Sequence, residues 1–261
     1  MNIDLTGKNA LVGGSSKGLG LAIAQRLASS GANVTLVARN KSALMKAVSE
    51  LDESKGQIHQ FLIVNFSKYE TFSKQIEAYF EKNNIDILVN NTQGPPPGKA
   101  LEKKIIDYQT AFDLLFKCAI HMTRLAIPHM KNQSWGRVIN VSSITVKEPL
   151  NNLVLSNSLR AALVTWAKTL SIDVAKFNIT INNVLTGFFD TERLEQLNSS
   201  KAVQQGKTLS KINNEIKDKI PMKRFGKVQE YSNLVCFLAS EKSGYITGTN
   251  IPIDGGVLKS L

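Results

Sequence analysis

The sequence has few of the residues that cross-link a chain or anchor it in a membrane. Only two of its 261 residues are cysteines, Cys118 and Cys236, too few for a disulfide framework or a cysteine metal site. No apolar run approaches the roughly 20 residues of a membrane-spanning helix, so we expect no membrane association. The first residues show no basic stretch followed by an apolar one, the mark of a signal peptide. These absences favour a globular protein of the reducing cytoplasm.

The sequence also has fewer acidic residues than basic ones, 21 against 32, and its formal net charge at pH 7 is +11. Nucleic acid is not the expected partner, because no basic helix with interleaved aromatics and no known binding module is present. Much of the excess lies in residues 201–227, where only Glu215 and Asp218 oppose the cations. This segment is either a solvated, lysine-rich surface or a lid over an anionic ligand, such as a phosphate-bearing cofactor or an acyl carrier.

Short β-rich runs alternate with helical segments along the chain. Between the first two runs, the helical segment Gly18–Ser30 places Leu19, Ile23 and Leu27 on one face. The seven runs are NALVGG, NVTLVAR, HQFLIVNF, DILVNN, RVINVSS, TINNVLTG and NIPIDGG. Nearly continuous apolar strands separated by helices predict a parallel sheet covered on both faces. Because no linker or repeat divides residues 1–261, we predict one doubly wound α/β domain of about seven strands.

The first β-rich run leads into a glycine-rich turn, ALVGGSSKGLGLAIAQRLA. Glycines permit positive φ and a close approach of phosphate to the backbone, and the first amides of the following helix are free to bind it. Between the first strand and the first helix, such a turn is typical of dinucleotide binding. We expect the cofactor to contact Gly14, Ser16, Lys17, Gly18, Leu19 and Gly20.

The end of the second β-rich run indicates which dinucleotide binds. Enzymes that use NAD usually have an acidic residue there, to accept hydrogen bonds from the adenosine ribose. This chain has Ala38, Arg39 and Asn40 instead, with Lys17 in the nearby turn. Two cations near the ribose favour a 2′-phosphate and therefore NADP(H). The alternative is that Lys17 and Arg39 are ordinary surface cations.

Several further motifs carry a resemblance to a known family. They are NNTQG (90–94), NVSS (140–143), INNVLTG (181–187) and YITGTNIPIDGG (245–256). With the glycine turn, they make the chain resemble the short-chain dehydrogenases/reductases over essentially its whole length. The resemblance implies a Rossmann-type fold in which Asn65, Asn90, Gly187 and Thr191 also line the cofactor site. The stretches GPPPG, VKEP and LVLSN are similar to a 3-oxoacyl-(acyl-carrier-protein) reductase-like subgroup that lacks the family's Tyr-x-x-x-Lys motif.

The resemblance also implies which positions are catalytic. In the family's usual mechanism a tyrosine donates a proton to the carbonyl oxygen, assisted by a lysine, a serine and an asparagine. The family's spacing places Ser143 at the serine, Ser156 at the tyrosine, Arg160 at the lysine and Leu115 at the asparagine. A serine hydroxyl is a far weaker acid than a phenol with a pKa of about 10, and an arginine stays charged. Losing the acid would slow the reaction by about 10² to 10⁴.

Lys147 is a candidate replacement acid, because a lysine desolvated in the substrate loop can act near neutral pH. The alternative is an exposed ion pair with Glu148. The three histidines, His59, His121 and His129, are expected to be structural, and we expect no metal site.

The leading hypothesis is an NADP(H)-dependent oxidoreductase that interconverts a carbonyl and an alcohol at an atypical site formed by Ser143, Lys147, Ser156 and Arg160. Its substrate would be a ketone, either a small molecule or a carrier-bound, 3-oxoacyl thioester-like group. The alternative is a non-catalytic NADP(H)-binding sensor or partner subunit, and a third class, an imine or enoyl reductase, would need another proton source. The resemblance further implies a homotetramer or homodimer, and a basic substrate lid at about 187–227.

Overall fold

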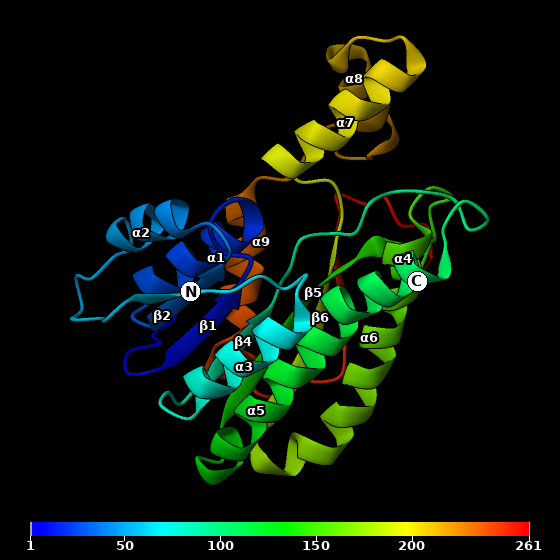
Figure 1. Ribbon diagram of the computed structural model, residues 1–261. Helices are drawn as coiled ribbons and strands as arrows, with labels where there is room; N and C mark the ends of the chain where they lie inside the picture. Colours follow the sequence, from blue (N-terminus) through cyan, green and yellow to red (C-terminus); the bar gives the residue numbers. More distant parts are fainter. Residues whose placement is uncertain (1, 261) are drawn as a thin grey trace.

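Seven parallel strands form one sheet in the computed structural model, which describes residues 2–260 (Figure 1). The strands are β1 (Asn9–Gly13), β2 (Asn33–Ala38), β3 (Gln60–Ile63), β4 (Ile87–Asn90), β5 (Gly136–Ser143), β6 (Ile179–Thr186) and β7 (Asn250–Ile253). They follow the order β3-β2-β1-β4-β5-β6-β7, and every neighbouring pair is parallel. The predicted doubly wound α/β fold is therefore confirmed.

The position of each strand in the sheet explains its composition. β1, β4, β5 and β6 are buried along nearly their whole length, because helices cover both faces of the sheet. The edge strands β3 and β7 are only partly buried and are four residues long. They are shorter than the runs HQFLIVNF and NIPIDGG predict, and the central strand β4 is likewise shorter than the run DILVNN.

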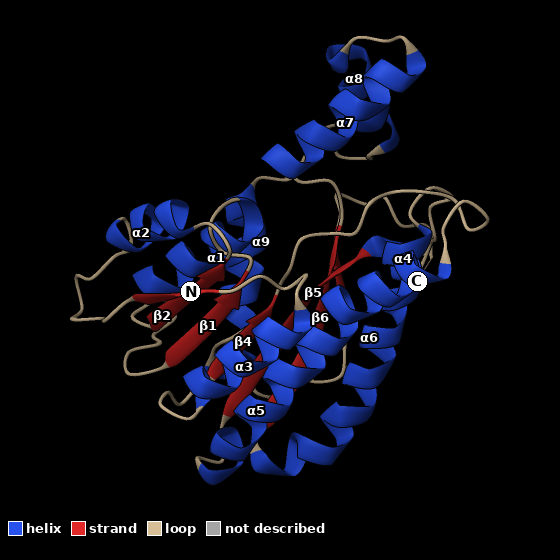
Figure 2. Cartoon of the chain, viewed as in Figure 1, coloured by secondary structure: helices blue, strands red, loops and turns tan. Residues whose placement is uncertain are grey.

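Helices form a layer on each face (Figure 2). One layer contains α1 (Gly18–Ser29), α2 (Lys41–Ser49) and α9 (Val228–Leu238), and the other contains α3 (Tyr69–Phe80), α5 (Cys118–Asn132) and α6 (Val154–Val174). Each layer packs on the sheet through its own apolar cluster. Within residues 2–260, no helix combines the length and apolar character needed to cross a membrane.

The helical segment over residues 105–132 is not a single regular α-helix. α4 (Ile105–Phe112) continues into a π-helical segment, Asp113–Lys117, and then into α5. Leu114 and Leu115 of this segment are buried. A π-helical turn widens the helix and often occurs at functional sites, so the position that the resemblance assigns to Leu115 has a distinct backbone.

The strand order reverses between β1 and β4, and this reversal positions the site. After β1 the chain enters α1 on one face of the sheet, whereas after β4 it leads to α4 and α5 on the other face. The two connections therefore separate and leave a crevice at the carboxyl ends of these strands, which is where open α/β sheets bind ligands.

A helical hairpin projects beyond the carboxyl ends of the strands (Figure 1). It consists of α7 (Glu192–Gln205) and α8 (Leu209–Lys219), joined at Gly206, whose φ of 61° ends α7. Its apolar cluster is separate from the two main ones and includes Ile212, Ile216 and Ile220. The hairpin lies within the basic segment that the sequence analysis assigned to a lid at about 187–227.

Candidate cofactor crevice and active site

The glycine-rich turn between β1 and α1 leaves room for a phosphate. Gly14 and Gly18 have φ of 56° and 59°, conformations that other residues rarely adopt. A Cβ at Gly20 would collide with the carbonyl of Gly14, so α1 can begin this close to the turn only with glycine there. Gly18 has an open face, because within residues 2–260 only the side chain of Thr191 would lie within 4 Å of a Cβ built on it. This open face at the start of α1, which has no side-chain cap, fits a phosphate group.

The loop after β4 forms the other side of the crevice. Asn91 donates from Nδ2 to the carbonyl oxygen of Gly13 at 3.0 Å and so holds this loop against the glycine turn. Asn90, which the resemblance placed along the cleft, is buried, and its amide donates to Thr123 and Asn140. The residue that contacts the glycine turn is thus Asn91, which the sequence analysis missed although it follows Asn90 directly.

A row of asparagine amides crosses the sheet below the crevice. Asn90 donates to Asn140, Asn140 donates to Asn183, and Asn183 donates to Asn250, each at 2.8 Å. These four residues are direct neighbours in register on β4, β5, β6 and β7. The row ties together the strands that end at the crevice. The sequence does not predict this row, because a cross-strand pair leaves no local signature.

Three of the four candidate catalytic residues lie around the end of β5. Ser143 is the last residue of β5, and its Oγ accepts hydrogen bonds from the amide and the hydroxyl of Thr145. Ser156 and Arg160 lie one turn apart on α6, and Arg160 Nε donates to Ser156 Oγ at 3.2 Å. Arg160 also donates from Nη1 to the carbonyl oxygen of Val141, two residues before Ser143. Arg160 therefore links α6 to the end of the strand that carries Ser143.

The charge of Arg160 has no carboxylate partner among residues 2–260. Burial lowers the pKa of Arg160, although a guanidinium stays protonated near neutral pH. Its neighbour Tyr231 belongs to no motif of the sequence. Tyr231 is fully buried, and its hydroxyl bonds to Thr186 Oγ1 at 3.0 Å. Burial raises the pKa of Tyr231, and the hydrogen bond between Tyr231 and Thr186 and the charge of Arg160 only partly oppose this rise.

Lys147 and Glu148 do not form the loop ion pair that the sequence left open. Lys147 is half-buried, and its side chain makes no hydrogen bond or ion pair with residues 2–260. Glu148 Oε1 instead accepts hydrogen bonds from the backbone amides of Lys259 and Ser260, both at 2.8 Å. These bonds lower the pKa of Glu148. The C-terminal segment is thereby attached to the loop that follows Ser143.

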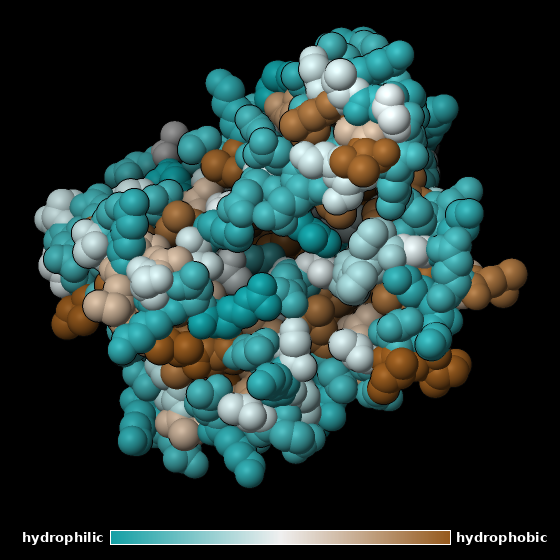
Figure 3. Space-filling view, turned by 45° about the horizontal axis from the view of Figure 1, so that its top comes forward, coloured by the Kyte–Doolittle hydropathy of each residue, from teal (hydrophilic) through white to brown (hydrophobic). Residues whose placement is uncertain are grey.

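The two cations expected near the adenosine ribose differ in their surroundings. Arg39 is exposed at the end of β2 and makes no ion pair within residues 2–260. Lys17 forms an ion pair with Glu192 of α7, with Nζ and Oε2 2.8 Å apart. This pair ties the hairpin to the glycine turn, and Figure 3 shows the surface hollowed between the hairpin and the body of the molecule.

The remaining candidate cofactor residues lie at or near the carboxyl ends of strands. Asn65 follows β3 and accepts a hydrogen bond from the amide of Ser67 at 3.0 Å. Gly187 follows β6, where a Cβ would collide with Asp254. Thr191 caps α7 by accepting a hydrogen bond from the amide of Leu194.

The histidines have structural partners on other segments. His59 accepts from the amide of Val34, His121 bonds to Tyr69 and Glu77, and His129 bonds to Asp86. Within residues 2–260, no group of three or more histidine, cysteine or acidic side chains is placed to hold a metal ion.

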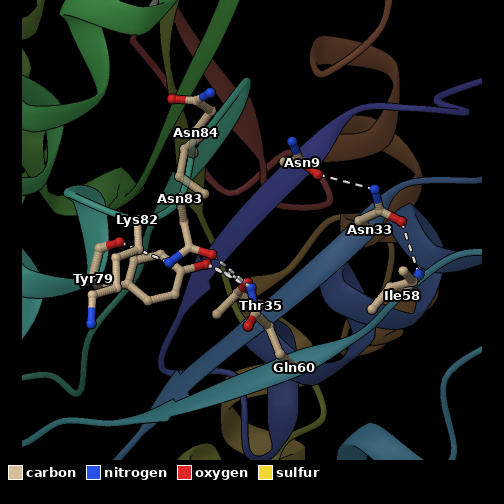
Figure 4. A pocket seen from close by; sticks show the side chains of 10 residues that line it. Asn9, Asn33, Thr35, Ile58, Gln60, Tyr79, Lys82, Asn83 and Asn84 are labelled. Atoms are coloured by element: carbon tan, nitrogen blue, oxygen red, sulfur yellow. Dashed lines mark hydrogen bonds between the residues drawn. The ribbon is translucent and has the colours of Figure 1, made fainter.

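A polar cavity of about 220 Å³ lies at the opposite end of the sheet from the glycine turn (Figure 4). Asn9 and Asn33, the first residues of β1 and β2, line it and bond to each other at 3.0 Å. The hydroxyls of Tyr79 and Thr35 are 2.7 Å apart beside them. Because these polar groups largely satisfy one another at the amino ends of the strands, the cavity does not belong to the candidate active site.

Comparison with known proteins identifies the family. A family model described as Enoyl-(Acyl carrier protein) reductase matches residues 14–258. The chain is 30% identical to the 3-oxoacyl-(acyl-carrier-protein) reductase FabG of Aquifex aeolicus over 258 residues, which are 98% of this chain and 100% of the relative. It is 31% identical to the NADPH-dependent reductase BacG of Bacillus subtilis, over 97% of this chain and 99% of the relative. The chain belongs to the short-chain dehydrogenase/reductase family.

Solved structures agree with this assignment. L-Sorbose reductase from Gluconobacter frateurii, in complex with NADPH and L-sorbose, matches with a TM-score of 0.92 and 31% identity over 100% of both chains. A 3-oxoacyl (acyl-carrier-protein) reductase from Agrobacterium tumefaciens with NADP bound matches with a TM-score of 0.86 and 27% identity, over 97% of this chain and 95% of the other.

Proposed function

We propose that this protein is an NADP(H)-dependent oxidoreductase that interconverts a carbonyl and an alcohol at an atypical active site. The observation that carries the proposal is the position of Arg160, which bonds both to Ser156 and to β5 two residues before Ser143. These residues lie at the carboxyl end of the sheet, as does the glycine turn with its open face at Gly18. Relatives that are named as reductases, and similar structures that contain NADPH or NADP, support the same cofactor here.

Ser143, Arg160 and Lys147 have different tasks in the proposed site. When bound, NADPH supplies the hydride that the carbonyl carbon accepts. The hydroxyl of Ser143 donates a hydrogen bond to the carbonyl oxygen, and the fixed charge of Arg160 stabilises the negative charge that develops there. Arg160 also donates to the ribose hydroxyls of the cofactor. Lys147, which has no partner in the structure, supplies the proton in place of a tyrosine.

The proposed substrate is a ketone, and the basic segment 201–227 favours a carrier-bound 3-oxoacyl thioester. Exposed lysines on α8, such as Lys211 and Lys219, give this part of the molecule a positive charge. An acyl group on a phosphopantetheine arm brings a phosphate to the mouth of the site, where such charge attracts it. Several relatives are named as 3-oxoacyl-(acyl-carrier-protein) reductases, in agreement with this class. We also propose a cytoplasmic homodimer or homotetramer.

One observation favours the alternative, a sensor or partner subunit that binds NADP(H) without turnover. Tyr231, whose pKa burial raises more than the charge of Arg160 lowers it, is not available as an acid in place of the family's tyrosine. Its hydroxyl is buried against Thr186 rather than free to meet a substrate. If Lys147 does not supply the proton, the site retains cofactor binding without an acid.

The test is NADPH oxidation by the purified protein with 3-oxoacyl thioesters, ketones and sugars. We expect turnover above background, a loss of about 10²-fold or more in kcat for Lys147→Ala, and a comparable loss for Ser143→Ala. NADPH binding, followed by fluorescence, should stay unchanged in both variants. Binding without turnover on any carbonyl would establish the sensor instead, and full activity of both variants would overturn the assigned roles.

A further inference from the structure

The first turn of α7 reaches both sides of the cofactor crevice. On one side, Glu192 pairs with Lys17, and the methyl group of Thr191 lies 3.8 Å from the position of a Cβ on Gly18. On the other side, a guanidinium nitrogen of Arg193 lies 3.9 Å from the position of a Cβ on Gly94, in the loop after β4. These consecutive residues therefore span the crevice between the β1 and β4 connections.

The two charged residues of this turn, Glu192 and Arg193, differ in whether they have hydrogen-bonding or ionic partners. Glu192 accepts from Lys17 at 2.8 Å and from Gln196 at 2.9 Å, so each oxygen of its carboxylate has a partner. Arg193 is exposed and makes no hydrogen bond or ion pair with residues 2–260. A positive charge without a counter-ion therefore lies at the edge of the crevice, and a planar guanidinium is well suited to bind phosphate oxygens in pairs.

We propose that Arg193 binds the pyrophosphate of the dinucleotide, so that closure of α7 over the crevice depends on the cofactor. The inference rests on the proposed function only in requiring that NADP(H) binds. The pyrophosphate is the expected partner because the glycine turn opposite Arg193 presents the open face of Gly18, where a phosphate fits. The 2′-phosphate belongs near Arg39 at the end of β2, on the far side of the glycine turn from β4.

Two features of the crevice explain why Arg193 can take this position. Gly94 has no side chain to separate the guanidinium from the β4 loop, and Gly18 has none to fill the space opposite. The Lys17–Glu192 pair holds the first turn of α7 over the crevice from one side only. A pyrophosphate bound between the two sides gives Arg193 a partner and secures the turn from the other side.

The first experiment measures NADPH affinity by fluorescence for the wild type and three variants. Arg193→Gln should lose about tenfold or more, the scale of one charge-assisted contact, and Arg193→Lys should lose less. Lys74→Gln removes the same charge from an exposed position on α3, in the helix layer away from the hairpin, and should stay within about twofold of the wild type. Wild-type affinity in Arg193→Gln would overturn the inference. Failure of the wild type itself to bind NADPH would overturn the proposed cofactor.

Two further measurements test which phosphate of the cofactor Arg193 binds and whether α7 closes over the crevice when NADPH binds. Arg193→Gln should weaken 2′-phospho-ADP-ribose, which has the pyrophosphate, but not adenosine 2′-monophosphate, which lacks it. Equal weakening of both ligands would overturn the assignment to the pyrophosphate. NADPH should also protect residues 196–211 from limited proteolysis in the wild type and not in Arg193→Gln. Equal protection in both proteins would overturn the link to closure.

Discussion

Arg160 contributes to the proposed site a charge that cannot be removed. A lysine at this position can lose its proton when desolvated, whereas an arginine remains a cation and presents its donors in a fixed plane. Here two of those donors are bonded to Ser156 and to the backbone of β5. Arg160 is thus suited to hold an oxygen and stabilise negative charge, but not to pass on a proton. The proton must come from another group, and Ser156 is too weak an acid to supply it.

Restoring a phenol and an amine tests this division of roles. In the Lys147→Ala background, the double variant Ser156→Tyr with Arg160→Lys should raise kcat by about 10²-fold or more on a ketone substrate, since it supplies the general acid that this background lacks. The matched control is Ser156→Phe with Arg160→Lys, which adds the ring without the hydroxyl. An equal gain in the control, measured by NADPH oxidation, would show that packing rather than proton donation changed the rate.

The row of asparagine amides acts at the scale of the strands. Asn90, Asn140 and Asn183 are each almost wholly buried, so these three amides depend on neighbouring protein groups for hydrogen bonds, whereas Asn250 is exposed. Only Asn90 Oδ1 is without a partner among the described residues of the row. Because a buried amide that loses its partner retains the cost of desolvation, the row favours one register of β4 to β7 and fixes the strand ends at the crevice.

Removal of one amide from the row should destabilise the sheet. Asn140→Ala leaves a donor of Asn90 and an acceptor of Asn183 without partners, so we expect a loss of about 1–3 kcal/mol in the free energy of unfolding. Urea unfolding measures this loss, with Asn151→Ala on the exposed loop before α6 as the control. A change below about 0.5 kcal/mol in Asn140→Ala would mean that water replaces the lost amide.

Sequence predicts the elements of this fold better than the contacts between them. The strands and the glycine turn have local signatures, namely apolar runs and glycines at fixed spacing, and each is present in the structure. The ion pair between Lys17 and Glu192 joins residues 175 positions apart, so no local pattern indicates it. The choice between Asn90 and Asn91 depends on which way the last residue of β4 faces. Arg193 is recognisable only once α7 is placed over Gly94.

At the scale of the whole molecule, positive charge is concentrated beside the opening of the site. The hairpin that contains much of the basic segment stands over the carboxyl ends of the strands, where the crevice lies (Figure 1). A net charge of +11 spread evenly would attract every anion equally, but a concentration beside the opening favours anions that approach the site. The distribution of charge is therefore an argument for a substrate that arrives on a large anionic carrier.

A salt titration with two forms of one substrate tests that argument. The KM for a 3-oxoacyl group on a carrier protein should rise steeply with ionic strength, because screening weakens attraction between exposed charges. The KM for the same acyl group on a short neutral thiol should change little.

Charge reversal on the hairpin tests the same attraction by mutation. Lys211→Glu with Lys219→Glu should raise the KM for the carrier-bound acyl group by about tenfold and leave the KM for the acyl group on the neutral thiol unchanged. Lys82→Glu, beside the cavity at the other end of the sheet, is the control and should affect neither. If the hairpin variant and the control behave alike, the charge beside the opening has no part in substrate capture, and a small free ketone becomes the substrate class to pursue.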